Sequence, residues 1–302
     1  MTGSVLVLGG SGRFGRHASE AFWNAGWRVT QYDRARGDLT AAARGNDVIV
    51  NGWNPPYDRW ADTVSALTAQ VIAAARKSGA TVIVPGNVYV FGEEAPALLG
   101  PTTPHTARNP LGRIRVDMEK AYRDSGVQTI ILRAGDFIDT EPSGNWFDRI
   151  IAKDAGRGRF VYPGDPDQPH AWAFLPDLAE TAVALAARRA DLPRFSDIPF
   201  AGYTLTGREL AAACGRALGR EVRLTRMSWL PIQLARPFWP MARRLAEMRY
   251  LWSMPHGLEP DTLAALLPNL RETPVETALS LALAGQIHPD EAMPRNGGAV
   301  PA

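Results

Sequence analysis

The stretch that decides the fold reads Val5-Leu6-Val7-Leu8-Gly9-Gly10-Ser11-Gly12-Arg13-Phe14-Gly15. Four apolar residues typical of a buried strand run directly into glycines, and a helical pattern follows over residues 15–25. The glycines fit two spacings, G-x-x-G-x-x-G from Gly9 and G-x-G-x-x-G from Gly10. Such a turn lets the backbone approach a pyrophosphate, whose charge the amide groups at the helix N-terminus stabilise. The stretch predicts a dinucleotide-binding βαβ unit, with residues 9–15, from Gly9 to Gly15, at the phosphates.

The second predicted strand, residues 28–32, leads into Asp33, which comes 18 positions after Gly15. A carboxylate at this point accepts hydrogen bonds from the adenosine ribose hydroxyls, which favours NAD. Arg34 and Arg36 follow at once and would instead neutralise the additional phosphate of NADP. The sequence therefore predicts a nicotinamide dinucleotide, with a slight preference for NAD.

Short apolar runs alternate with helical patterns over the first 180 residues. The strand candidates are residues 5–8, 28–32, 47–51, 81–84 and 129–132, and the helix candidates are residues 15–25, 62–78 and 114–125. Buried β-branched runs separated by helices predict an α/β fold with a doubly wound, parallel, Rossmann-type sheet. The loops after the strands then share one edge, where ligands bind.

Beyond residue 140 turn residues and short helical patterns replace this alternation. We predict a dinucleotide-binding domain over residues 1–180 and a small substrate-covering region over 181–285, to which 140–175 contribute. Within it, Thr206 and Glu209 have capping-box spacing for a helix over 206–218. Residues 286–302 are rich in Pro, Gly and Ala and are predicted to be disordered.

Residues 227–256 contain three of the nine tryptophans and are divided by three prolines. We interpret this segment as a lid over a pocket. Its large aromatic residues face either a partly apolar substrate or the core of the small region; they are Trp229, Phe238, Trp239 and Trp252.

Composition narrows the class of protein. The 302 residues include 33 basic and 31 acidic side chains of interspersed sign, which argues against a nucleic-acid partner. Cys214 is the one cysteine, which excludes an intrachain disulfide, and its Ala-rich helical surroundings predict burial. We expect no signal peptide, no spanning helix and no membrane partner, hence a soluble cytoplasmic protein. The scattered histidines show no metal-ligand spacing, so no metal is predicted.

Several further segments together resemble the short-chain dehydrogenase/reductase superfamily, in its extended NAD-dependent epimerase/dehydratase branch, over about residues 3–285. They are Asp38-Leu39, Asn51-Gly52-Trp53, residues 82–92 with Gly86 and Asn87, Leu132-Arg133-Ala134-Gly135-Asp136, and residues 172–179 around Asp177. The resemblance implies that Asp38 and Leu39 contact adenine and that Asn51, Gly52, Trp53, Gly86, Asn87, Ala134 and Gly135 line the cofactor. It also implies a small-molecule substrate and a possible homodimer. We expect Asp177 to be a helix N-cap rather than a catalyst.

The catalytic motif of the family, Pro-Tyr-Gly-x-x-Lys-x-x-x-Glu, is altered here. Residues 110–119 read Pro-Leu-Gly-Arg-Ile-Arg-Val-Asp-Met-Glu, so Leu111 replaces the tyrosine and Arg115 the lysine. Asn87 stands where the family has Ser or Thr. Leucine has no proton to transfer, and an arginine stays protonated. Arg115 would still hold the nicotinamide ribose, and Asn87 would polarise a carbonyl.

The proton carrier must then be another residue. Tyr89 and Asp136 are the main candidates, and His105 and His170 are further ones. We predict an atypical NAD(P)-dependent oxidoreductase or epimerase-like enzyme acting on a carbonyl or carbinol carbon, with Asn87, Tyr89, Arg115 and Asp136 at the catalytic site. The alternative is an inactive dinucleotide-binding protein that senses redox state for a protein partner.

Overall fold

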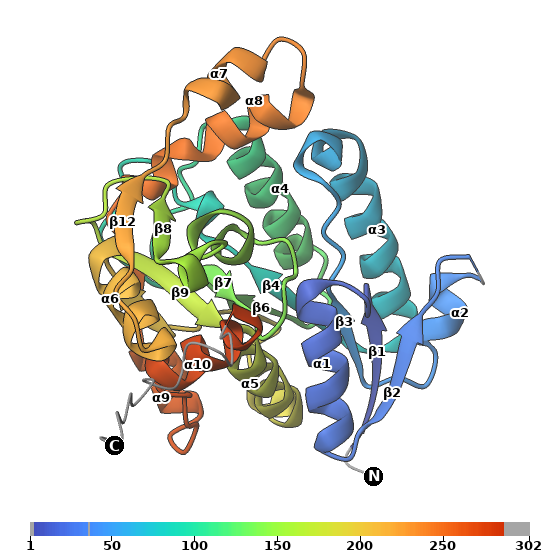
Figure 1. The fold of residues 1–302 in the computed structure, drawn as a ribbon. Helices are drawn as coiled ribbons and strands as arrows, with labels where there is room; N and C mark the ends of the chain where they lie inside the picture. The colour runs from blue at the N-terminus through green and yellow to red at the C-terminus, as the bar shows by residue number, and fades with distance from the viewer. Residues whose placement is uncertain (1–2, 36, 287–302) are drawn as a thin grey trace, which may run out of the picture.

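The structure is a computed structural model that describes residues 3–35 and 37–286 (Figure 1). Its strands are β1 (Ser4–Leu8), β2 (Arg28–Tyr32), β3 (Val48–Asn51), β4 (Thr81–Gly86), β5 (Leu98–Leu99), β6 (Thr129–Arg133), β7 (Asp136–Ile138), β8 (Arg159–Tyr162), β9 (His170–Phe174), β10 (Phe195–Pro199), β11 (Tyr203–Leu205), β12 (Arg223–Arg226) and β13 (Gly257–Leu258). Its α-helices are α1 (Arg13–Asn24), α2 (Leu39–Ala43), α3 (Trp60–Ser78), α4 (Pro110–Asp124), α5 (Leu175–Ala187), α6 (Gly207–Leu218), α7 (Leu230–Ala235), α8 (Pro240–Glu247), α9 (Asp261–Leu266) and α10 (Val275–Ala282). Shorter turns are η1 (Tyr57–Arg59), η2 (Val88–Val90), η3 (Phe147–Ile151), η4 (Ala155–Arg157), η5 (Arg189–Asp191), η6 (Met248–Trp252) and η7 (Ala284–Gln286).

A six-stranded parallel sheet forms the centre of the molecule, in the order β10-β6-β4-β3-β1-β2. Alternate residues of each strand face opposite layers of helices. In β1, Leu6 and Leu8 pack towards α2, α3 and α4, whereas Val5 and Val7 pack towards α1 and α5. Figure 1 shows α1 and α5 on one face of the sheet and α3 and α4 on the other. This is the predicted Rossmann-type fold, and the five predicted strands and three predicted helices are confirmed.

The sixth strand, β10, was not predicted. It lies beside β6 with Asp197 opposite Ile131, inside the segment assigned by sequence to the substrate-covering region. Ser196 and Asp197 interrupt its apolar pattern, so the strand depends on its neighbour rather than on its own propensity.

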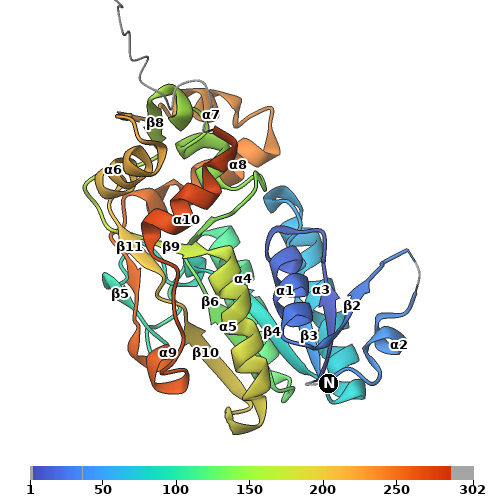
Figure 2. The ribbon, with the colours of Figure 1, turned by 60° about the horizontal axis from the view of Figure 1, so that its bottom comes forward.

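The remaining elements form a smaller body with its own core. It contains the sheet β11-β9-β7, the pair β12-β8 and helices α6 and α10, packed around large side chains such as Trp172 and Phe160. Figure 2 shows α6, α7, α8 and α10 gathered over one end of the large sheet. Thr206 and Glu209 form the predicted capping box, and Cys214 is buried, as predicted.

Two sequence-based expectations, on Asp177 and on the direction of Phe238 and Trp239, are wrong, and a third falls on residues outside the described part of the chain. Asp177 is not an N-cap: Phe174 holds that position, and the Asp177 carboxylate accepts hydrogen bonds from the Thr273 amide and hydroxyl, both at 2.7 Å. Phe238 and Trp239 face outward, whereas Trp229 and Trp252 are buried. The predicted disordered tail lies, from residue 287, outside the described residues.

In the part of the chain that the structure describes, no helix has the length and apolar character needed to cross a bilayer.

Candidate active site

The glycine turn after β1 has the geometry of a phosphate cradle. Gly9 has a φ of +73°, and a Cβ at Gly15 would lie 2.1 Å from the Gly9 carbonyl oxygen, so the turn tolerates no side chain there. Gly12 is the N-cap of α1, with no side-chain cap and no acidic residue in the first turn. The first amides of α1 therefore keep their capacity to donate to an anion. These residues fit a dinucleotide pyrophosphate.

Two other predicted residues of the turn have structural roles through their side chains. Arg13 donates to the carbonyl oxygens of Ser143 and Gly144, at 2.9 and 2.6 Å, and so ties the smaller body to this turn. Phe14 is buried against the sheet. Any contact of Phe14 with a phosphate is therefore made by its backbone.

The adenosine end of the site lies after β2. Asp33 is exposed, and one of its carboxylate oxygens accepts from the Ala35 amide at 2.9 Å. The Arg34 guanidinium lies 4.5 Å from the centre of the Trp53 ring. Asp38 caps α2 by accepting from the Thr40 amide, and Leu39 is buried. Arg36 lies outside the described residues.

The ends of β3, β4 and β6 form the middle of the same edge. Asn51 is buried and donates to the Tyr122 hydroxyl at 2.9 Å. A Cβ at Gly52 would lie 2.8 Å from the Leu8 carbonyl oxygen, and one at Gly135 would lie 2.1 Å from that of Ala171. The Ala134 amide donates to the Gly86 carbonyl oxygen at 3.1 Å. The predicted cofactor-lining residues therefore come together at one sheet edge.

Helix α4 carries the two positions at which this chain departs from the family motif. Leu111 is fully buried. Arg115 is also buried: its guanidinium lies 4.1 Å from the centre of the Trp60 ring and donates to Asn54 Oδ1 at 2.8 Å. The Arg115 Nε group is buried without a hydrogen-bond partner, so one donor remains for a ligand.

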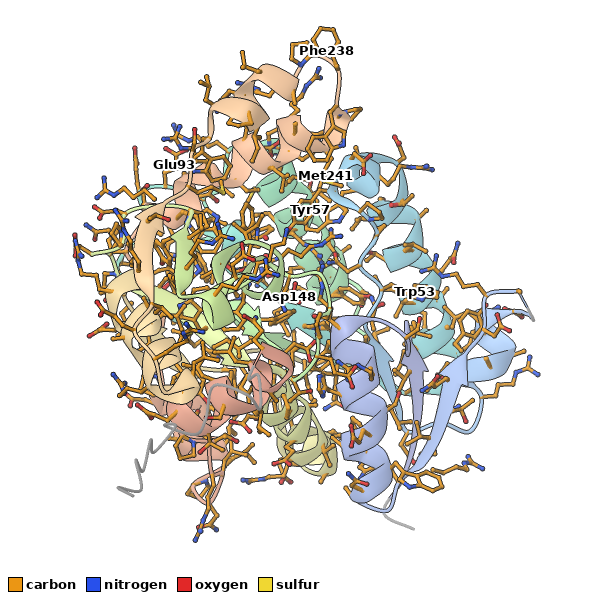
Figure 3. All side chains as sticks on the ribbon, viewed as in Figure 1. Trp53, Tyr57, Glu93, Asp148, Phe238 and Met241 are labelled. Carbon is orange, nitrogen blue, oxygen red and sulfur yellow. The ribbon has the colours of Figure 1, made fainter. Side chains whose placement is uncertain are left out.

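Two phenols meet beside Arg115. The hydroxyl groups of Tyr57 and Tyr89 lie 2.6 Å apart, and the Tyr57 ring packs edge-on against Trp60. Burial raises the pKa of Tyr57, which the hydrogen bond from Tyr89 and the charges of Arg13 and Arg115 partly offset. Burial likewise raises the pKa of Tyr89, well above its usual range. Figure 3 shows Tyr57 beneath the α7–α8 segment, near Met241.

Sequence reasoning missed Tyr57. It follows β3 by six residues, in a Pro-rich loop, and no spacing relates it to Tyr89, which is 32 residues further along. The usable signal was its place after a strand that ends at the cofactor edge.

Asp136 and His170, two of the predicted proton carriers, form a pair. His170 Nε2 lies 2.8 Å from Asp136 Oδ2, with the Asp136 side chain 25% exposed and that of His170 3% exposed. His170 in turn stacks on Trp252, with ring centres 4.5 Å apart, and packs edge-on against His256. The Asn87 Oδ1 accepts from the Tyr89 amide at 3.1 Å, which fixes the side-chain amide of Asn87 beside Tyr89.

His256 is fully buried, and sequence reasoning did not identify it. Its Nδ1 lies 2.9 Å from the Met254 carbonyl oxygen, which makes Nδ1 the protonated nitrogen, and its Nε2 has no partner. Burial, together with the charge of His170, lowers the pKa of His256 to about 3. The ring is therefore neutral at any working pH.

This shift predicts an acid-sensitive stability. Because the unfolded chain binds a proton at His256 below its ordinary pKa of 6.5 and the folded chain only near 3, stability falls as the pH drops through that window. At pH 5 the loss is about 2 kcal/mol. The variant His256→Asn keeps a donor for the Met254 carbonyl but no longer binds a proton, so it lacks this pH-dependent contribution to stability. Urea unfolding at pH 7.5 and pH 5 is expected to give a smaller drop in the variant; equal drops would contradict the assignment.

Glu247, at the end of α8, reaches the start of α4. Its Oε1 accepts from the Leu111 amide at 2.5 Å and from Asn109 Nδ2 at 3.3 Å, while its Oε2 pairs with Arg244 at 3.0 Å. A carboxylate at this position caps the helix and stabilises its N-terminus. The α8 segment therefore helps to position the helix that carries Arg115.

Behind the site lies a buried ionic network centred on Arg133. All five of its N–H groups donate: to both oxygens of Glu119, both oxygens of Asp197 and the Asn87 carbonyl oxygen, at 2.5–3.1 Å. Burial raises the pKa of Asp197, but the charge of Arg133 and the hydrogen bond with His105 outweigh it and lower the pKa overall. Donor atoms of His105, Glu119 and Asp197 lie within 4.8 Å of one another. Because Arg133 already engages both carboxylates, this cluster is an ion network and not an open metal site.

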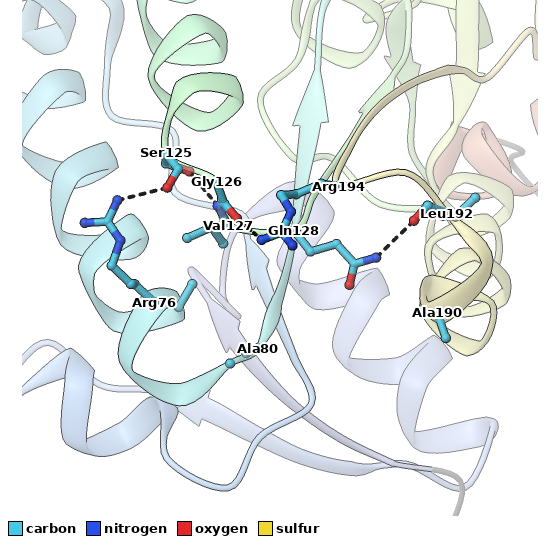
Figure 4. Close-up of a pocket in the computed structure, with 11 residues that line it drawn as sticks. Arg76, Ala80, Ser125, Gly126, Val127, Gln128, Ala190, Leu192 and Arg194 are labelled. Atoms are coloured by element: carbon cyan, nitrogen blue, oxygen red, sulfur yellow. Dashed lines mark hydrogen bonds between the residues drawn. The ribbon is translucent and has the colours of Figure 1, made fainter.

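A hollow of about 590 Å³ lies away from this edge, near the N-terminal ends of β4 and β6 (Figure 4). Its two arginines, Arg76 and Arg194, donate to the carbonyl oxygens of Ser125 and Gly126. Its lining contains no carboxylate, histidine or phenol, so the hollow lacks the groups for acid–base chemistry.

Fold and glycine turn together define a Rossmann-type protein, and its fold matches that of solved proteins that bind NAD or NADPH. Of the motifs quoted for the resemblance in sequence, Asp38-Leu39 begins α2, and the others include the ends of β3, β4, β6 and β9. The missing Tyr and Lys are the departure from it.

Solved structures share this architecture along nearly the whole chain. The sugar-nucleotide protein MoeE5, solved with UDP-glucose and NAD, is 14% identical, has a TM-score of 0.71 and covers 93% of this chain and 98% of its own. The human epimerase family protein SDR39U1, solved with NADPH, is 18% identical, with a TM-score of 0.71 and coverage of 92% and 98%. UDP-glucose 4-epimerase from Brucella ovis, solved with NAD, is 17% identical, with a TM-score of 0.70 and coverage of 94% and 98%. No protein-family model matches the chain, and no curated protein matches its sequence.

Proposed function

We propose that the protein is an NAD(P)-dependent oxidoreductase of the epimerase-like kind. It acts at a carbonyl or carbinol carbon of a small, partly apolar molecule. The Tyr57–Tyr89 pair takes the place of the tyrosine that is missing at position 111. The observation that carries this proposal is the 2.6 Å contact between the two phenols beside the buried Arg115.

The dinucleotide supplies hydride acceptance and return at its nicotinamide. Its pyrophosphate fits against the glycine turn and the start of α1, and the buried Nε of Arg115 fits a ribose hydroxyl. When a carbinol carbon gives up its hydride, the hydroxyl proton must pass to the protein. An ionised Tyr57 accepts that proton while Tyr89 donates a hydrogen bond to it. In the reverse direction Tyr57 returns the proton to the carbonyl oxygen.

Asp136 is the second acid–base group of the site. It faces the phenol pair closely enough for its charge to raise both phenol pKa values, and His170 holds its carboxylate from behind. An Asp136–His170 pair is suited to relay a proton between the phenols and solvent.

The test is a fluorescence titration of the protein with NADH and NADPH, followed by a screen of aldehydes and ketones for cofactor oxidation. We expect binding of at least one dinucleotide and turnover with some of the carbonyl compounds. Tight binding with no turnover on any of them, unchanged by Tyr89→Phe and Asp136→Asn, would support the redox-sensing alternative. If neither dinucleotide bound at millimolar concentration, both the proposed oxidoreductase and the redox-sensing alternative would be refuted.

Asp33 provides a separate prediction on cofactor choice. Asp33→Gly removes a charged acceptor for the ribose hydroxyls, so NAD affinity is expected to fall about tenfold to hundredfold. NADP affinity is expected to hold or rise, because the carboxylate would repel a ribose phosphate. Asp33→Asn keeps the hydrogen bond to the Ala35 amide and serves as the control for turn geometry. Calorimetry with both dinucleotides measures the difference; equal losses would mean that Asp33 does not contact the ribose.

A further inference from the structure

The α7–α8 hairpin exposes an apolar tip. The described residues include eight large hydrophobic side chains with substantial exposure, and four of them belong to this hairpin: Leu230, Leu234, Phe238 and Trp239. Phe238 is 89% exposed. Figures 1 and 3 show the two helices projecting from the body, with Phe238 at the outer end. Such a concentration of exposed apolar surface marks an interaction site.

The base of the hairpin is firmly attached, so the outward direction of these side chains is built into the fold. Trp229 is buried and its Nε1 donates to the Pro163 carbonyl oxygen at 2.6 Å, and Ala242 is fully buried. Leu230 and Leu234 are four residues apart and therefore share one face of α7. Phe238 and Trp239 continue that apolar surface around the turn.

The same segment is strongly basic. Residues 223–249 contain six arginines and one acidic residue, Glu247, which is already paired with Arg244. Arg236 and Arg243 are exposed next to the tip, and within residues 3–35 and 37–286 neither forms an ion pair. Cationic side chains around exposed Leu, Phe and Trp match the interface of a bilayer that contains anionic lipids.

We propose that the α7–α8 hairpin docks the protein on an anionic membrane surface, with Phe238 and Trp239 inserted among the headgroups. The sequence predicted no membrane partner because no segment is long enough to span and because Pro231, Pro237 and Pro240 argue against one long amphipathic helix over residues 227–256. Lying on a surface needs no spanning helix. A second copy of the chain fits less well, since a stable dimer buries about 800 Å² per partner and the tip is small and convex.

The docking surface adjoins the candidate active site. Helix α8 packs against η1, which carries Tyr57. Docking therefore brings the phenol pair near the membrane surface.

The test is co-sedimentation of the full chain with vesicles of phosphatidylcholine alone or mixed with phosphatidylglycerol. We expect binding to the anionic vesicles, weaker binding to the neutral ones and a loss of binding as salt rises. The double variants Phe238→Ser/Trp239→Ser and Arg236→Glu/Arg243→Glu are each expected to weaken binding at least about tenfold. Because these side chains are exposed, we expect unchanged unfolding midpoints.

Trp23→Ser is the matched control, because Trp23 is 70% exposed on α1, far from the hairpin. It is expected to leave vesicle binding unchanged. Three results would overturn the proposal: no binding to anionic vesicles, an equal loss in Trp23→Ser, or a dimer in solution that Phe238→Ser/Trp239→Ser dissociates. The last would assign the tip to a second copy. None of these readouts depends on cofactor or turnover, so they separate this proposal from the proposed function.

Discussion

Replacing Arg133 with methionine is expected to lower the free energy of unfolding by about 3–5 kcal/mol. The substitution leaves Glu119 and Asp197 buried next to each other with His105 as their one remaining basic neighbour among the described residues, and it removes five hydrogen bonds in one step. One of these bonds holds the Asn87 carbonyl, so the turn that carries Tyr89 loosens as well. Urea unfolding at pH 7.5 measures the loss.

The matched control is Arg208→Met, which breaks an exposed ion pair with Asp167. Such pairs contribute at most about 1 kcal/mol. Arg133→Lys is the intermediate variant, because an ammonium keeps the charge but cannot engage two carboxylates through a planar fork. Similar losses in Arg133→Met and Arg208→Met would mean that the network does not stabilise the fold. If Arg133→Met fails to fold, the loss in the free energy of unfolding of Arg133→Lys, compared with that of Arg208→Met, still tests whether the network stabilises the fold.

Replacing Tyr57 with phenylalanine is expected to reduce turnover about 10²–10⁴-fold, with little change in dinucleotide affinity. The variant keeps the ring that packs on Trp60 but has no hydroxyl to carry the proton. Tyr89→Phe is expected to reduce turnover less, because it removes the hydrogen bond that eases ionisation of Tyr57. The measurement is kcat with a carbonyl substrate from the screen, alongside cofactor titration.

The two phenols act as one unit, so the double variant should lose scarcely more than Tyr57→Phe alone. Tyr250→Phe is the control, because the Tyr250 hydroxyl is buried without a hydrogen-bond partner and lies outside the pair. Since burial raises the pKa of both phenols, they hold their protons at neutral pH, and alcohol oxidation is expected to accelerate as the pH rises. Unchanged turnover in Tyr57→Phe would refute its role as the proton carrier.

The parallel sheet was predictable because its strands β1, β3, β4 and β6 contain continuous apolar runs that need no partner to be recognised. The glycine turn was also predictable from the sequence. A Cβ at Gly15 would collide with the Gly9 carbonyl oxygen, so only glycine fits that position. β10 was not predictable, because Asp197 is stabilised in the interior by residues far away in the chain, chiefly by Arg133, 64 residues earlier. A single strand's pattern does not contain that partner.

The candidate site was predictable only in part, because a local sequence pattern shows single residues but not their distant partners. Asp136 and His170 were each identified as proton carriers, but their pairing at 2.8 Å depends on how β7 and β9 lie side by side. Tyr57 carries only a weak local signal, its place shortly after β3, and His256 carries none, because their environments are assembled from distant loops. The outward direction of Phe238 was likewise undecided, since the helices around it are too short to show a periodic apolar face.

Glu247 connects the α7–α8 hairpin to helix α4, which carries Arg115. Any tilt of α8 away from the body withdraws the acceptor of the Leu111 amide and frees the first turn of α4. Arg115 lies one turn further along that helix, so its contact with Trp60 would shift in the same movement. The position of the hairpin is thereby coupled, through one hydrogen bond to helix α4, to the guanidinium beside the phenols.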